Sequence, residues 1–110
     1  AGIAKAGTEN KLVVLVFGAD WDKSSADLEQ VTLNHRDVRA ALDEDFVVVK
    51  IDCTQDTDER NSLWSRFRVL GEPAVLVLAR DYTTVIARED RFLDAPEMLT
   101  LLREAKDKAR

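Results

Sequence analysis

The chain contains short, nearly continuous apolar runs separated by longer stretches in which apolar residues recur every three or four positions. Residues 12–17, 46–51 and 74–79 are valine-rich runs of this kind, and they predict β-strands. Because neither face of these runs is polar, they are expected to be central strands buried on both faces. Residues 83–87 are more mixed, which predicts an edge strand, and only three residues separate them from the preceding run, so those two strands should form a hairpin.

The interval between the first and second predicted strands contains two predicted helices. Leu28 and Val31 are expected to form the apolar stripe of the first helix. Asn34 is the predicted N-cap of the second. The apolar stripe of that second helix is Val38, Ala41 and Leu42.

Two further helices are predicted in the second half of the chain. Asp56 and Glu59 resemble a capping box, and the helix that follows should bury one side. That side carries Leu63, Trp64 and Phe67. Asp94, Pro96 and Glu97 form the clearest helix start in the sequence. The buried stripe predicted after it is Met98, Leu101, Leu102 and Ala105.

The resulting order is β-α-α-β-α-β-β-α, which is typical of an α/β domain. The first two strands should be parallel, joined by a right-handed helical crossover, and the last two antiparallel. We therefore expect a four-stranded mixed sheet flanked by helices on both faces. The 110 residues fit one domain, residues 11–110, after a small, polar and flexible lead-in at residues 1–10.

Composition excludes several classes of function. The formal net charge is −5, which argues against a nucleic-acid-binding face. No apolar stretch reaches the roughly 20 residues that span a bilayer, so no direct membrane insertion of the domain is expected. Cys53 is the only cysteine, which rules out an internal disulfide and a four-cysteine zinc site. No metal ion and no other cofactor is expected.

Two motifs give the predicted order a family likeness. "ADWDKSS" follows the first strand, and "VLGEPAVLVL" leads into the third. With this order they resemble the thioredoxin fold, most closely the C-terminal thioredoxin-like domain of bacterial transmembrane thiol:disulfide interchange reductases. The likeness covers roughly residues 11–104. It implies a thioredoxin fold and a cis-proline at the Glu72–Pro73 bond.

The same resemblance puts the two active-site cysteines of the family at Asp22 and Ser25, directly after Trp21, and a buried acidic residue of related thioredoxins at Val16. Disulfide exchange needs an attacking thiolate and a second, resolving thiol, and neither Asp22 nor Ser25 supplies one. Helix capping is the favoured role of Asp22, Ser24 and Ser25. The resemblance therefore implies a thioredoxin-fold domain with a degenerate C-x-x-C and no redox activity.

In the family, the cis-proline loop faces the active-site loop across a shallow groove that receives an extended peptide. Here that groove would consist of Trp21, Asp22, Glu72 and Pro73, and the resemblance favours an exposed position for Trp21. We expect a binding or scaffold module whose partner is a protein or extended peptide, not a nucleic acid. The carboxylates of Asp22 and Glu72 should favour basic or polar peptides over acidic ones.

Other roles stay open. Cys53 is expected to be a half-buried filler, but as a lone thiol it could serve an oxidoreductase. His35 is expected to be an ordinary first-turn residue of its helix and not a base for Ser25. The domain could also be a structural part of a larger membrane reductase. The resemblance favours a periplasmic location, while a cytoplasmic one and the oligomeric state stay open.

Overall fold

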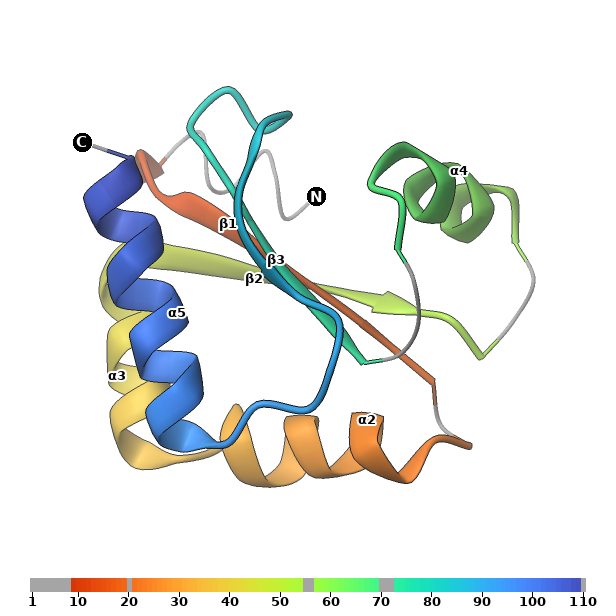
Figure 1. Ribbon diagram of the computed structural model, residues 1–110, viewed down its shortest axis with the longest axis horizontal. Helices are drawn as coiled ribbons and strands as arrows, with labels where there is room; N and C mark the ends of the chain where they lie inside the picture. Colours follow the sequence, from red (N-terminus) through yellow and green to blue (C-terminus); the bar gives the residue numbers. More distant parts are fainter. Residues whose placement is uncertain (1–8, 20, 55–56, 70–72, 110) are drawn as a thin grey trace.

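The computed structural model describes residues 9–19, 21–54, 57–69 and 73–109, and in these it contains one four-stranded sheet with the strand order β2-β1-β3-β4 (Figure 1). The strands are β1 (Leu12–Gly18), β2 (Phe46–Asp52), β3 (Ala74–Leu78) and β4 (Val85–Glu89). The predicted lead-in, residues 1–10, lies almost entirely outside the described residues.

The pairing of the strands confirms the predicted mixed sheet. β1 runs parallel to β2, with Leu12 opposite Phe46, and antiparallel to β3, with Val13 opposite Leu78. β3 and β4 form the predicted antiparallel hairpin, with a register irregularity at Val77 and Leu78. Parallel strands need a crossover, and the segment between β1 and β2 supplies it with helices.

β4 begins two residues later than the sequence predicts. Asp81 accepts hydrogen bonds from the backbone N–H groups of Thr83 and Thr84, so these two residues belong to the turn and not to the strand. The hydroxyl of Thr84 also donates to Asp81, over 2.6 Å. These hydrogen bonds, that of the Thr84 hydroxyl first among them, lower the pKa of Asp81 to about 2.

The position of β2 corrects a prediction, because this strand lies at an edge of the sheet and not in its centre. Only its beginning is buried on both faces. Phe46 packs into the core on one face of the sheet, and Val47 packs into the core on the other. From Val48 onward the strand is half-buried or exposed, and Lys50 is exposed. β2 is therefore an edge strand that is covered on both faces of the sheet only at its first two residues, although its valine-rich sequence continues beyond them.

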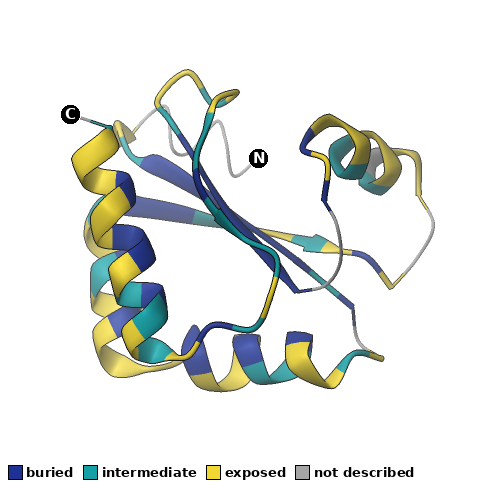
Figure 2. Ribbon diagram, in the orientation of Figure 1, coloured by how far each residue is buried: buried dark blue, intermediate teal, exposed yellow. Residues whose placement is uncertain are grey.

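Helices cover both faces of the sheet, as predicted (Figures 1 and 2). One face is packed by α3 (Arg36–Asp45), by α5 (Ala95–Lys108) and by η1 (Leu28–Thr32), a π-helical segment that continues α2 (Lys23–Asp27). The other face is packed by α4 (Asp58–Arg66). In β1, Val14 and Val16 point to the first face and Val13 and Leu15 to the second, so the strand is apolar throughout.

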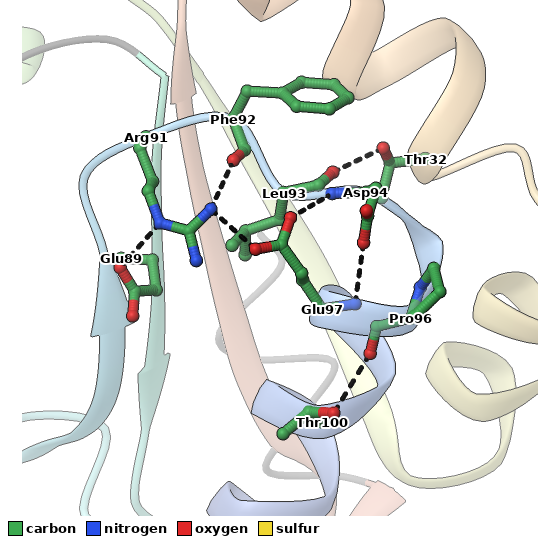
Figure 3. Close-up of polar contacts among 9 residues, drawn as sticks. All are labelled: Thr32, Glu89, Arg91, Phe92, Leu93, Asp94, Pro96, Glu97 and Thr100. Carbon is green, nitrogen blue, oxygen red and sulfur yellow. Dashed lines mark hydrogen bonds and ion pairs between the residues drawn. The ribbon is translucent and has the colours of Figure 1, made fainter.

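The π-helical segment overturns the predicted apolar stripe of the first helix. Leu28 is buried, but Val31 is 61% exposed. The N–H of Leu33 bonds to the carbonyl oxygen of Leu28, five residues back, so one extra residue fits into this turn. As a result Thr32 points inward in place of Val31, and its hydroxyl donates to the carbonyl oxygen of Leu93 (Figure 3).

Two predicted N-caps are also wrong. α3 begins after His35, and the Nδ1 atom of His35, not Asn34, accepts the N–H of Asp37. His35 is thus a cap and not a first-turn residue. α4 begins after Thr57, whose hydroxyl oxygen accepts the N–H of Arg60. The predicted cap Asp56 lies outside the described residues.

The predicted start of the last helix is confirmed in every part. Asp94 accepts the N–H of Glu97, and the carboxylate of Glu97 accepts the N–H of Asp94, which is a capping box (Figure 3). Arg91 adds an ion pair of 2.9 Å to Glu97. The predicted stripe of α5 is buried.

This capping box should make stability depend on pH. The N–H of Asp94, and after it the guanidinium of Arg91, lowers the pKa of Glu97 below 4.5. Because the pKa is lower in the folded state, the stabilisation is complete above the unfolded value of 4.5 and is lost as pH falls through the folded value. We expect Glu97→Gln, which keeps the acceptor but not the charge, to lose less stability than wild type in urea denaturation between pH 5 and pH 3. Equal losses would contradict this.

The end of α4 contains a strained residue whose replacement should stabilise the fold. Arg68 has a φ of 52°, and the N–H of Val69 bonds back to Trp64, which is the arrangement in which glycine is preferred. We expect Arg68→Gly to raise the free energy of unfolding by about 0.5–1 kcal/mol, since left-handed backbone costs roughly 1–2 kcal/mol for other residues. Arg68→Ala removes the same exposed side chain but keeps the Cβ atom, so it should give no gain in the same urea titration.

Candidate functional site

The turn between β1 and α2 carries the motif around Trp21. The N–H of Asp22 bonds to the carbonyl oxygen of Ala19 over 3.1 Å, and this closes the turn. The side chain of Trp21 is 72% exposed, the highest value of any large apolar residue described. The exposure predicted for Trp21 is therefore present, and Asp20 lies outside the described residues.

Asp22 and Ser25 bond to each other at the start of α2. Oδ2 of Asp22 accepts both the backbone N–H of Ser25, over 3.0 Å, and its hydroxyl, over 2.7 Å. Asp22 is thus the N-cap that the sequence predicts, and Ser25 is only 8% exposed. The side chains of Asp22 and Ser25 therefore converge.

This cap predicts a moderate loss of stability in Asp22→Ala. The change removes the acceptor of the Ser25 N–H and leaves a buried hydroxyl without its acceptor, so the free energy of unfolding should fall by about 1–2 kcal/mol. Urea denaturation followed by circular dichroism measures the loss. Ser24→Ala is the matched control, because Ser24 lies two residues away and is exposed. Equal losses in the two variants would show that the cap is not what matters.

A hollow of about 360 Å³ lies beside this helix start. The last three register pairs of the parallel strands β1 and β2 line it, and these pairs are Val16–Lys50, Phe17–Ile51 and Gly18–Asp52. Residues of α2 and η1, with Ser25 among them, form the opposite wall. The hollow thus lies at the carboxyl end of the parallel strand pair, a frequent place for ligands in open α/β sheets.

Gly18 allows α2 to approach the sheet closely at this point. A Cβ atom on Gly18 would lie 3.2 Å from the Cβ and 3.3 Å from the Oγ of Ser25, closer than the neighbouring atoms normally allow. Gly18 is not among the site residues that the sequence predicts. A glycine at the end of an apolar strand, directly before a turn, was the available signal.

Charged side chains also line the hollow, and none of them is among the site residues that the sequence predicts. Lys50 of β2 and Glu29 of η1 form an ion pair of 2.7 Å across it. The carboxylate of Asp52 accepts hydrogen bonds from Thr54. The backbone N–H of Thr54, and after it the Thr54 side chain, lowers the pKa of Asp52, so this carboxylate stays ionised at neutral pH. A lysine inside the valine-rich second strand was a signal that this end of the strand is open.

The structure brings together only part of the predicted groove. Pro73 is buried and lines the same hollow as Ser25. Trp21 does not line the hollow and projects from the turn before it. Glu72 lies outside the described residues, so the predicted cis bond and the predicted acidic wall stay predictions.

The remaining candidates have structural surroundings. Cys53 is 5% exposed in the core under α4, its Sγ lies 3.7 Å from the carbonyl oxygen of Ile51, and its N–H donates to Gly18. The hydroxyl of Ser25 donates to Asp22 and the ring of His35 accepts from Asp37, so both side chains are engaged away from each other. Among the described residues, no three acidic, histidine or cysteine side chains lie close enough to hold a metal ion. No described helix is long and apolar enough to cross a bilayer.

Comparison with known proteins decides the family. Residues 1–79 match the family model described as Thioredoxin-like. The chain belongs to the thioredoxin-like family. Within this family it is 34% identical over 93 residues to the thiol:disulfide interchange protein DsbD of Ralstonia nicotianae, and 36% identical over 72 residues to DsbD of Neisseria meningitidis. These stretches cover 84% and 66% of this thioredoxin-like chain but only 15% and 12% of the relatives.

Solved structures agree with the family. The reduced C-terminal domain of Neisseria meningitidis DsbD has a TM-score of 0.80 at 29% identity, over 94% of this chain and 90% of that one. A thioredoxin from Thermus thermophilus has a TM-score of 0.85 over 98% of this chain and 83% of that one, and at 24% identity it supports the fold alone. The thioredoxin fold that the sequence predicts is therefore confirmed, and the likeness to DsbD C-terminal domains with it.

Proposed function

We propose that this thioredoxin-like domain has lost dithiol chemistry and acts as a binding or scaffold module for an extended protein segment. The observation that carries the proposal is the contact between Asp22 and Ser25. The resemblance assigns the two active cysteines of the family to these positions, and the chain has Cys53 as its one cysteine. The two side chains converge as a working pair would, but they carry oxygen in place of sulfur.

The chemistry of these groups supports redox inactivity. A carboxylate such as that of Asp22 does not attack a disulfide, and no second thiol is present to resolve a mixed disulfide. Ser25 is an alcohol whose hydroxyl donates to a carboxylate, and a carboxylate is far too weak a base to ionise an alcohol. The pair therefore caps α2 and holds the shape of the loop.

Two features support the binding role. Trp21 exposes a large aromatic surface next to the helix start, and aromatic residues are enriched in protein interfaces. Pro73 lines the same hollow as Ser25, and the resemblance implies a peptide groove beside this proline. Asp22 adds negative charge, and Glu72 would add more, so the proposed partner is a basic or polar segment.

The alternative is an oxidoreductase role through Cys53, or a structural role in a larger membrane reductase. The burial of Cys53 opposes the first, because attack on a disulfide needs an accessible thiolate. The curated relatives are much longer than the stretch they share with this chain, which fits the second. A periplasmic location belongs to the proposal, since the chain resembles domains of such reductases.

Two measurements test the proposal. In an insulin-reduction assay with dithiothreitol, wild type and Cys53→Ser should both match the rate without protein. Turnover that disappears in Cys53→Ser would overturn redox inactivity. In an NMR titration of the ¹⁵N-labelled protein, unstructured peptides carrying net positive charge should shift the amides of Trp21 and Asp22 and the Trp21 indole. Trp21→Ala should weaken that binding, and no shift with any peptide would contradict the binding role.

A further inference from the structure

The hollow beside α2 has the size of a binding site for a small group. Its volume of about 360 Å³ is near the lower end of the roughly 300–1,000 Å³ that is typical of small-molecule sites. Sheet lies on one side, the α2–η1 segment on the other, and Pro73 contributes to the wall. A hollow of this size fits one side chain or one small amphipathic molecule.

One wall of the hollow is apolar. Val16, Leu28 and Leu33 line it, and they are 7%, 1% and 9% exposed. All three belong to the core on the α3–α5 face of the sheet, so the surface that they present is held in place by packing. Such a wall favours an aliphatic stem over a fully hydrated group.

The charge around the hollow is negative. Glu29 and Asp52 line it, and the carboxylate of Asp22 bonds to Ser25, which lines it too. Among the described residues that line it, Lys50 is the one cation, and Glu29 already pairs with it. Three carboxylates against one ammonium group leave an excess negative charge that attracts cations and repels anions.

We propose that this hollow binds an alkylguanidinium or alkylammonium group, with the aliphatic stem against Val16, Leu28 and Leu33 and the cation near Asp52. Such a group is available on an arginine or lysine side chain of a bound peptide and on a free aliphatic amine. The peptide source rests on the proposed function and would make the hollow its specificity pocket. The free-amine source does not depend on it.

The direct test is an NMR titration of the ¹⁵N-labelled protein with n-butylguanidinium. Saturable shifts of the amides of Ser25, Leu28 and Asp52 are expected. Neutral n-butanol should bind at least about fivefold more weakly, roughly a 1 kcal/mol difference, and anionic pentanoate should give no saturable shift. Equal binding of all three probes, or shifts confined to other parts of the chain, would overturn the proposal.

Two variants assign the effect to the hollow. Asp52→Asn should weaken n-butylguanidinium binding about fivefold or more, and Asp58→Asn, which changes an exposed carboxylate at the start of α4, should not. Val16→Leu narrows the hollow with a small change in core volume and should weaken binding of the stem. Equal effects of Asp52→Asn and Asp58→Asn would show that binding depends only on the net charge of the protein, and this would overturn the site.

A peptide pair separates the two sources. One unstructured peptide carries a central arginine, and the other carries norleucine there. Stronger binding of the arginine peptide, with shifts at both Trp21 and Ser25, supports the specificity pocket. Binding of both peptides alike, with no response to n-butylguanidinium, overturns the pocket while the proposed function stands. A response to n-butylguanidinium without any peptide binding supports the free-amine source and contradicts the proposed function.

Discussion

The double variant Asp22→Cys/Ser25→Cys is expected to form an internal disulfide and to reduce insulin, while the wild-type chain does neither. The reason is that the two side chains already converge, with 2.7 Å between Oδ2 of Asp22 and Oγ of Ser25. Positions with this approach can satisfy the short separations that a disulfide requires. The Ser25 N–H that now bonds to Asp22 would favour a thiolate at position 22 and so its attack on a substrate.

The expected gain is large, because under the proposed function the wild type has no accessible thiolate for exchange. We expect insulin reduction to rise about 100-fold or more above the wild-type background, at a cost of about 1 kcal/mol for the lost cap. Titration of thiols before and after mild oxidation measures the disulfide, and turbidity measures the activity. The single variants Asp22→Cys and Ser25→Cys are the controls and should give mixed disulfides without turnover. A double variant that stays reduced under oxidation would show that two thiols at these positions are not sufficient for a disulfide in this loop.

The second prediction concerns the position at which the family likeness places a buried acid. Val16→Asp should lower the free energy of unfolding by about 3 kcal/mol at pH 7, because a well-packed valine is lost and a carboxylate is desolvated. Val16 is 7% exposed and packs against the α3–α5 face of the sheet. Lys50, its register partner on β2, already pairs with Glu29, so the new carboxylate would have to share this ammonium group with Glu29.

The pH dependence identifies the cause. Burial raises the pKa of the introduced carboxyl in the folded state, so its cost is smallest below the ordinary value of about 3.9 and grows as pH rises through the folded value. Val16→Asn has similar size and polarity but does not titrate, so its cost should not change with pH. Urea denaturation of both variants between pH 4 and pH 8 measures the difference. Parallel curves for the two variants would contradict desolvation as the cause.

Much of the candidate site was available from local sequence. The cap at Asp22 and the capping box of Asp94 with Glu97 involve residues three positions apart, and such short-range bonds follow from residue type and spacing. Cysteine content is a property of composition, so the absence of a dithiol was evident as well. The exposure of Trp21 rested on family likeness, since a tryptophan in a loop can equally be buried.

The errors have two causes. The edge position of β2 depends on strand pairing that the local pattern does not specify. The exposure of Val31 and the cap at His35 come from local hydrogen bonds that residue type and spacing did not single out among the alternatives. A valine-rich run shows that both faces of a strand are covered somewhere along its length, but not which strands flank it. A single π-type hydrogen bond to Leu28 rotates the helix and exchanges the inward residue.

Residue pattern and composition were sufficient for the α/β class, the order of the elements, the caps at Asp22 and Asp94 and the lack of a second thiol. The tertiary structure alone decided which residues meet: Ser25 with Val16 and Lys50 around one hollow, and Gly18 under the start of α2. The physical reason is the distance along the sequence between the residues that make each contact. Caps and stripes depend on residues a few positions apart, whereas the hollow joins β1, β2 and the α2–η1 segment through strand register and core packing.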